Sequence, residues 1–457
     1  MKSIVISLAL IIVGFPLFAK EYSIHSAEEL NTIHLAAGDI VLLKGETWQD
    51  QKLVFKGQGT ETSPILLTVE NPGETILTGS SSLIIEGSWL IVDGLLFKNG
   101  YTLKENVISF SAKSNNCRLT NCAIVNYNNP DKAVRNSWIV LYGTKNRVDH
   151  CYIEGKTHLG TTIGVYVSDQ PNYHRIDHNY FANRPPLGRN GGETIRMGTD
   201  KWSMHDSFTL VEENVFVNCD GEIEIISNKS TNNTIRNNLF YESKGMVTLR
   251  HGNKANVYGN YFIGNQKERT GGIRIIGEDH KITNNYFHGL TGVGLNATIT
   301  FMNAWENPPL HGYWQIKNTE VRGNTIVDCA EPIVIGSGKN EKTVLPPWNN
   351  LIADNIVVSA KDTAITWTEA KAKNPENIKF ENNVFFNVKR PQNEPYPTGV
   401  RIEDPKLKRD TYGVMERTKE TTKGTGFEAE TSIQASLFNA KDIGPHWLTL
   451  KRDFRIK

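Results

Sequence analysis

A short motif recurs along most of this 457-residue chain and constrains its fold more than any other feature. In each copy a polar residue, usually Asn, precedes two to four apolar or aromatic residues. The copies begin at Asn121, His150, Asn179, Asn214, Asn238, Asn260, Asn285, Asn324, Asn355 and Asn383, 22 to 39 residues apart. This period indicates a solenoid, in which each repeat buries its apolar side chains only against neighbouring repeats.

The spacing favours a parallel β-helix. The shortest intervals match one coil, and the longer ones predict loop insertions, which tend to build the binding face of a solenoid. Strands of successive coils would stack about 4.8 Å apart. Asn tolerates left-handed backbone and so suits a repeated bend, and stacked Asn side chains can hydrogen-bond along the stack. Long helical patterns are nearly absent, and no leucine-rich or WD-type signature occurs. We predict an all-β protein, a single-stranded right-handed parallel β-helix with terminal caps.

The amino terminus has the features of an export signal. Lys2 precedes an apolar run over residues 4–18, and Ala19 follows as a small residue suited to cleavage. The run is too short to span a bilayer comfortably as an anchor. We predict a signal peptide over residues 1–19, a secreted or periplasmic location, and no membrane association after cleavage.

The remaining residues, 20–457, are predicted to form one β-helix domain. A cap over about residues 20–75 would contain a short helix with Ser26 as its N-cap residue. The repeat fades beyond about Pro405, so residues 405–457 are predicted to form a loop-rich cap over the last coil.

Composition limits the partners and metals. The net charge of +1 gives no sign of a nucleic acid partner, so any basic surface must be local. Four of the five cysteines lie in or beside apolar strand segments, which favours small buried side chains over a disulfide framework, although one bridge stays open. No CxxC pair suggests zinc.

Three neighbouring coils, residues 219–230, 247–253 and 271–277, hold an unusual density of charge. Lys229, Arg250, His251 and Arg274 each precede the next motif Asn by 9 to 11 residues. This register predicts that the four side chains lie at nearly one level on adjacent coils. The pattern is compatible with a basic substrate-binding patch and equally with a structural charge ladder.

Glu222 and Glu224 are two residues apart in a predicted strand, so both should point to one face and Ile223 to the core. Two such carboxylates repel unless a cation lies between them. Oxygen ligands with flexible geometry favour Ca²⁺ over Mg²⁺. The alternative is a solvated strand face with ordinary salt bridges.

These segments resemble polysaccharide lyase family 6, which contains alginate lyases and chondroitinase B. The resemblance covers nearly the whole chain after the signal peptide. The matching pieces are residues 53–59, 190–196, 220–230, 249–253, 272–275 and 442–447.

The resemblance implies a role for each matching residue. Glu222 and Glu224, with Asn190, match calcium ligands. Lys229 matches the catalytic base, and Arg250 matches its catalytic partner. The positions that match substrate-binding residues are Arg196, His251, Arg274 and, beyond a variable loop, Tyr313.

The implied reaction is β-elimination at a uronate, leaving a 4,5-unsaturated end. The sequence of residues 220–227 resembles the alginate enzymes more than chondroitinase B. The expected substrate is therefore alginate, an acidic polysaccharide, with cleavage at mannuronate. The alternative is dermatan sulfate, as for chondroitinase B. A pectin-type hydrolase or a non-catalytic glycan-binding solenoid on the same scaffold also stays open. The sequence does not define the oligomeric state.

Overall fold

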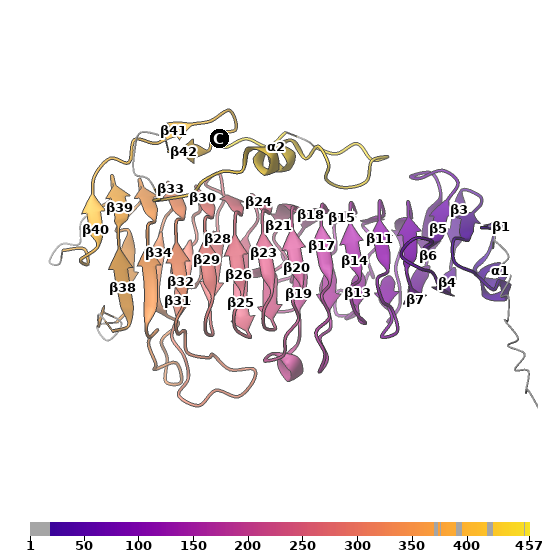
Figure 1. The fold of residues 1–457 in the computed structure, drawn as a ribbon, viewed down its shortest axis with the longest axis horizontal. Helices are drawn as coiled ribbons and strands as arrows, with labels where there is room; N and C mark the ends of the chain where they lie inside the picture. The colour runs from indigo at the N-terminus through magenta and orange to yellow at the C-terminus, as the bar shows by residue number, and fades with distance from the viewer. Residues whose placement is uncertain (1–18, 370–372, 375, 390–394, 418–423, 452) are drawn as a thin grey trace, which may run out of the picture.

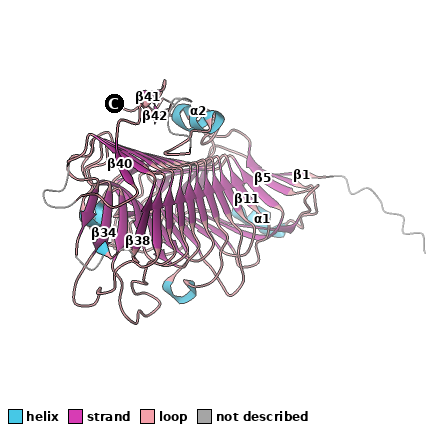
Figure 2. Ribbon diagram, turned by 60° about the vertical axis from the view of Figure 1, so that its left-hand side comes forward, coloured by secondary structure: helices cyan, strands magenta, loops and turns pink. Residues whose placement is uncertain are grey.

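The computed structural model describes residues 19–369, 373–374, 376–389, 395–417, 424–451 and 453–457. The predicted signal peptide lies outside these residues except for Ala19. Three long parallel sheets of 14, 14 and 12 strands run the length of the molecule, and each complete coil contributes one strand to each sheet in turn (Figure 1). Figure 2 shows the strands stacked coil upon coil. The predicted all-β, right-handed parallel β-helix is confirmed.

We call the sheets A, B and C in the order in which a coil passes through them. Sheet A comprises β1 (Glu21–Ile24), β2 (Ile40–Leu43), β5 (Ile65–Val69), β8 (Leu90–Asp93), β11 (Arg118–Thr120), β14 (Arg147–Asp149), β17 (Arg175–Asp177), β20 (Leu210–Glu212), β23 (Thr234–Arg236), β26 (Asn256–Tyr258), β29 (Lys281–Thr283), β32 (Glu320–Arg322), β35 (Asn350–Ala353) and β38 (Ile378–Glu381). Sheet B comprises β3 (Thr47–Gln49), β6 (Ile76–Gly79), β9 (Leu96–Gly100), β12 (Ala123–Val125), β15 (Tyr152–Glu154), β18 (Tyr180–Arg184), β21 (Val215–Cys219), β24 (Leu239–Tyr241), β27 (Tyr261–Ile263), β30 (Tyr286–His288), β33 (Thr325–Val327), β36 (Ile356–Val358), β39 (Asn383–Phe386) and β40 (Val400–Ile402). Sheet C comprises β4 (Lys52–Gln58), β7 (Ser82–Ser88), β10 (Ile108–Phe110), β13 (Ile139–Leu141), β16 (Ile163–Val165), β19 (Ile195–Met197), β22 (Glu224–Lys229), β25 (Gly245–His251), β28 (Thr270–Ile275), β31 (Ile299–Met302), β34 (Ile333–Ser337) and β37 (Ile365–Trp367).

The motif Asn residues form a ladder at the turn between sheets A and B. From Asn179 to Asn383, each backbone N–H and each side-chain N–H of one rung donates to the side-chain oxygen of the next, at 2.9 to 3.1 Å. The expected hydrogen-bonded stack is therefore confirmed. The left-handed bend, however, belongs to the residue before each rung, such as His178 and Asn237. In the first two copies, Asn121 and His150 take this bend, and Cys122 and Cys151 take the rung.

Removal of one rung is expected to destabilise the fold. Asn260 is fully buried, donates to the carbonyls of Ile235 and Tyr258, and accepts from Asn238. Asn260→Ala leaves these buried groups without partners and should lower the free energy of unfolding by about 2–4 kcal/mol. Urea unfolding followed by circular dichroism measures it. Asn31→Ala, at an exposed position, is the control and should change stability by less than about 0.5 kcal/mol.

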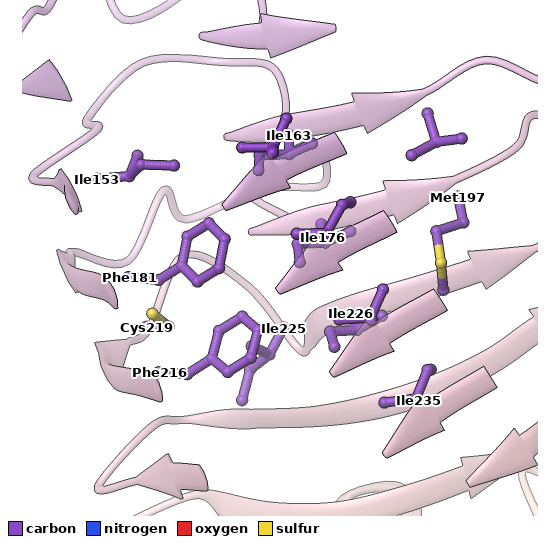
Figure 3. Packing of buried hydrophobic residues seen from close by; sticks show 14 of the residues in the cluster. Ile153, Ile163, Ile176, Phe181, Met197, Phe216, Cys219, Ile225, Ile226 and Ile235 are labelled. Atoms are coloured by element: carbon purple, nitrogen blue, oxygen red, sulfur yellow. The ribbon is translucent and has the colours of Figure 1, made fainter. Parts of the chain in front are cut away.

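The interior is filled by like side chains on successive coils. Five stacked rings, with centroids 4.6 to 4.8 Å apart, run through Phe181, Phe216, Phe240, Phe262 and Phe287. Figure 3 shows part of this column with the isoleucines that pack against it. All five cysteines are buried and free, which confirms their interpretation as small core side chains.

Among the described residues, two α-helices lie outside the sheets. The predicted helix of the amino-terminal cap is present as α1 (Ala27–Thr32), and the Ser26 hydroxyl accepts a hydrogen bond from the Glu29 N–H at 3.2 Å. The carboxy-terminal segment contains β41 (Lys408–Arg409), β42 (Met415–Glu416) and α2 (Thr431–Asn439). No helix of the described residues is both long and apolar enough to cross a membrane.

The carboxy-terminal segment lies elsewhere than expected. It runs back along the outer face of sheet B instead of covering the last coil (Figure 1). The physical reason is a second apolar cluster, because this face of sheet B carries apolar and aromatic side chains. Those side chains pack against Val414, Phe427, Leu437, Phe438 and Phe454.

Candidate functional site

The outer face of sheet C carries the charged residues singled out from the sequence, in two rows rather than one. Arg196 and Arg274 share a row, because the register pairs Arg196 with Ser227, Ser227 with Thr248, and Thr248 with Arg274. Lys229 pairs with His251 two residues further along the strands. The prediction of one level was wrong for Arg274. It lies 11 residues before the next Asn, against 9 for Lys229 and His251, and this two-residue difference is the offset between the two rows.

A cluster of three carboxylates lies at the start of β22. Glu193, Glu222 and Glu224 each bring an oxygen within 4.8 Å of the others. Close packing of the two coils makes this possible, since a Cβ on Gly192 would lie 2.5 Å from the Gly221 carbonyl oxygen. Glu222 and Glu224 therefore converge as expected.

The strand pattern that led to this expectation was wrong. Glu222 precedes β22, and Ile223 is half-buried instead of pointing to the core. A bulge in β22 places both Ile225 and Ile226 in the interior (Figure 3).

The carboxylate cluster lacks partners for part of its negative charge. Burial, together with the neighbouring Glu193 and Glu224 carboxylates, raises the pKa of Glu222 to about 8. Glu193 Oε2 and Glu222 Oε1 are buried and accept no hydrogen bond from the described residues. Unpaired buried carboxylate oxygens are costly, and a hard cation would satisfy them. The donor set therefore suits Ca²⁺, with Glu193, Glu222 and Glu224 as the oxygen ligands.

Arg274 is buried behind this cluster and donates to Glu224 Oε1. Arg184, also buried, donates to the backbone oxygen of Glu193 at 2.9 Å. These two cations offset part of the negative charge. Arg274, matched to a substrate-binding position, thus lies at the acid cluster as a partner of Glu224.

A cavity of about 230 Å³ opens beside the carboxylates. Lys229 and Glu193 both line it, and so does Asn190, which is exposed. Arg196 also lines it, and its guanidinium lies over the Tyr166 ring, 5.8 Å from the centroid. The cavity therefore brings together the Lys229 amine, the Arg196 guanidinium and Glu193, one carboxylate of the acid cluster.

Asp200, in the short 3₁₀ turn Asp200–Trp202, connects the second row. Its Oδ1 lies 3.7 Å from Lys229 Nζ and 3.4 Å from His251 Nε2. Burial and the neighbouring Arg250 and Lys229 lower the pKa of His251 to about 3, so its imidazole is neutral. Arg250 Nη1 lies 3.4 Å from His251 Nδ1, which leaves the Nε2–H to face Asp200.

Arg250 is held by a loop from the far side of the site. Its guanidinium donates to the carbonyls of His311 and Gly312, each at 3.1 Å. It also lies over the Tyr313 ring, 4.4 Å from the centroid. Tyr313, which was matched to a substrate-binding position beyond a variable loop, therefore contacts Arg250.

Glu193 and Asp200 were missed as functional residues. Glu193 lies inside segment 190–196, which resembles the family. The two glycines before it, which permit close approach to the next coil, could have pointed to it. Asp200 lies in an insertion outside the repeat, so no register pointed to it.

Fold and site together define a β-helix protein of the polysaccharide lyase class. The family model of chondroitinase B matches residues 24–443. The chain belongs to this family, polysaccharide lyase family 6. A search of curated proteins found no match.

Solved structures support the same assignment. The family 6 alginate lyase AlyGC is 37% identical, with a TM-score of 0.86 over 94% of this chain. This chain spans only 59% of AlyGC. A mannuronic acid specific family 6 lyase from human gut microbiota is 30% identical, with a TM-score of 0.79 over 94% of this chain and 97% of that one. Pedsa3628 from Pseudopedobacter saltans, also of family 6, is 29% identical, with a TM-score of 0.70 over 86% of this chain and 98% of that one.

Proposed function

We propose that this protein is an alginate lyase that cleaves the polymer by calcium-assisted β-elimination, with mannuronate at the cleaved position. The observation that carries the proposal is a cavity lined by Lys229, Arg196 and Glu193, the last of which belongs to the carboxylate cluster. The same surface holds a base, cations for a uronate carboxylate, and oxygen ligands for a hard cation. β-Elimination at a uronate needs a base and neutralisation of the uronate carboxylate, and the second can come from a cationic side chain, a bound metal ion or both.

The reaction begins at the C5 proton of the uronate. Lys229, in its neutral form, takes this proton as general base. The C5–H electron pair forms the C4=C5 double bond while the C4–O bond breaks, and the departing oxygen takes up a proton. When bound, calcium would neutralise the uronate carboxylate and stabilise the negative charge that develops next to it.

Arg250 stabilises the leaving oxygen. Its guanidinium is a poor proton donor, because arginine stays protonated in proteins. Two carbonyls and the Tyr313 ring fix its position, so it presents positive charge without rearrangement. Arg196 is positioned to bind a uronate carboxylate at the cavity.

Alginate is favoured over dermatan sulfate by the relatives. AlyGC is described as an alginate lyase and the gut enzyme as mannuronic acid specific. The chondroitinase B model makes dermatan sulfate the second candidate. The predicted signal peptide leads us to propose further that the enzyme meets its polymer outside the cytoplasm.

One assay tests the proposal. The protein is incubated with alginate, mannuronate-rich alginate and dermatan sulfate, each with calcium or with a chelator. We expect ultraviolet absorbance from the C4=C5 bond and unsaturated oligosaccharides by mass spectrometry, with mannuronate-rich alginate cleaved fastest. Products that carry an added water would show a hydrolase, and unchanged polymer would show a binding protein.

Calcium affinity is expected to rise with pH up to about 8. Below the Glu222 pKa of about 8, the ion-free cluster holds a proton that the metal must displace. The apparent affinity should therefore weaken by up to about tenfold for each pH unit below 8 and level off above it. Calorimetry at pH 6, 7 and 8 measures this dependence.

Glu222→Gln provides the comparison, because the amide has no proton to displace. It should bind calcium more weakly at pH 8, with a flatter pH dependence, so the difference from the unmodified protein should shrink as the pH falls. An equal slope in both proteins would contradict the role of Glu222.

A further inference from the structure

A second group of metal-binding side chains lies far from sheet C. Among the described residues, two groups of three or more His, Cys, Asp or Glu side chains have ligand atoms within 4.8 Å of one another. One is the carboxylate cluster, and the other is His150, Asp442 and His446. His150 lies at the turn between β14 and β15, and the other two belong to the carboxy-terminal segment. The segment 442–447, singled out in the sequence, has no part in the proposed reaction.

The structure fixes the His150 ring in advance. Its Nδ1 lies 2.7 Å from Oδ2 of Asp149, whose side chain is fully buried. Nδ1 therefore carries a proton and donates it to the carboxylate. In the neutral form of the ring the lone pair is then on Nε2, which faces Asp442. A carboxylate behind a histidine is the usual partner of a metal-binding imidazole, since it sets the tautomer and orientation.

The neighbouring His178 shows the contrast. Its ring stacks on His150 with centroids 5.0 Å apart. Asp177 and Glu213 occupy its two nitrogens, at 2.8 and 3.1 Å. Of this stacked pair, therefore, His150 alone presents an imidazole nitrogen to Asp442 and His446.

The segment that brings Asp442 and His446 is fixed on both sides. The Gly444 N–H donates to the His178 carbonyl at 2.8 Å, and the Trp447 indole N–H donates to the Asn121 carbonyl at 2.7 Å. Ile443 is buried in the apolar cluster under the segment. Two side chains from a distant part of the sequence are thus held against His150 by contacts that do not involve them.

The distances suit a small cation. His150 Nε2 and Asp442 Oδ1 are 3.5 Å apart, too long for a hydrogen bond. Two ligands of a tetrahedral zinc ion, each about 2.1 Å from the metal, lie about 3.4 Å apart. Two imidazoles and one carboxylate are a donor set for zinc or a similar transition metal, with one position left for water.

We propose that His150, Asp442 and His446 form a zinc-type site that fastens the carboxy-terminal segment to the β-helix. Asp442 and His446 are exposed, so the site is open to ions from solution. It is independent of the proposed lyase reaction. Its residues lie on the turn between sheets A and B and on the carboxy-terminal segment, whereas the proposed reaction takes place on sheet C.

Calorimetric titration of the chelator-treated full chain with zinc chloride tests the proposal. The carboxylate cluster can also take zinc, so the experiment is done in a Glu222→Gln background, where that contribution is weakened. We expect His446→Ala and Asp442→Asn each to weaken the remaining zinc binding by at least about tenfold. His25→Ala, which removes an exposed histidine elsewhere, should leave it unchanged.

A second readout follows the segment itself. Zinc should slow proteolysis of the carboxy-terminal segment in the unmodified protein and not in Asp442→Asn, while calcium should have no such effect. Unfolding midpoints in chelator should agree among the variants, because the ligand side chains are exposed or half-buried. Equal zinc affinity in the unmodified protein and both ligand variants would overturn the site. Zinc binding that is lost with Glu222→Gln and unaffected by the ligand variants would also overturn the site. His150 and Asp442 would then form an ordinary ion pair.

Discussion

Lys229→Ala is expected to reduce the rate of alginate cleavage by about 10²–10⁴-fold, the usual contribution of a general base. Lys229 is the lysine of the cavity, and its side chain is only 18% exposed. No other described lysine lines that cavity to take the C5 proton. The initial rate of absorbance increase from unsaturated ends measures the effect. Polymer binding should persist, because Arg196 and the cluster remain.

Lys281→Ala is the matched control, since Lys281 is exposed on sheet A, away from the site. It should retain full activity. Both variants should unfold at the midpoint of the unmodified protein. Full activity in Lys229→Ala would end the assignment of the base and leave the cavity as a binding site.

Calcium removal is expected to lower activity by at least about 10²-fold, because the uronate carboxylate then keeps its charge next to the carbon that must become negative. Excess calcium should restore the rate. Glu222→Gln should need about tenfold more calcium for half-maximal activity, since one charged ligand is lost. Activity as a function of free calcium, set with a chelating buffer, measures both effects.

Glu268→Gln, at a side chain that is 79% exposed, is the control for the loss of a negative charge and should follow the unmodified curve. Unchanged activity in excess chelator would contradict the metal role. The lyase assignment would survive that result, because Arg196, which lines the cavity, could then neutralise the carboxylate.

The repeat alone predicted the architecture. Each copy of the motif must stack on the next, so the period predicted the coils of a solenoid. The buried Asn residues from Asn179 to Asn383 are aligned from coil to coil, as that prediction requires. The position of the bend was misplaced by one residue, because a short polar residue suits both a rung and a left-handed turn. Only the hydrogen-bond pattern separates the two.

The site was predictable where it followed the repeat and the family motifs. Lys229, Glu222 and Glu224 were found in this way. Arg274 was placed on the wrong row, because a two-residue difference in its spacing to the next Asn was taken as one level. Asp200 and the contact between Arg250 and Tyr313 depend on inserted loops, whose paths are set by tertiary packing. The path of the carboxy-terminal segment was predicted wrongly for the same reason, since it too is set by tertiary packing.

The position of that segment has a consequence for the order of assembly. During synthesis the coils of sheet B emerge first, and the residues that cover their aromatic outer face are made last. Until Phe427, Phe438 and Phe454 arrive, the nascent solenoid presents a continuous apolar strip to its surroundings. A chain shortened before residue 425 would keep every coil yet expose that strip permanently, so it should self-associate although its coils are complete.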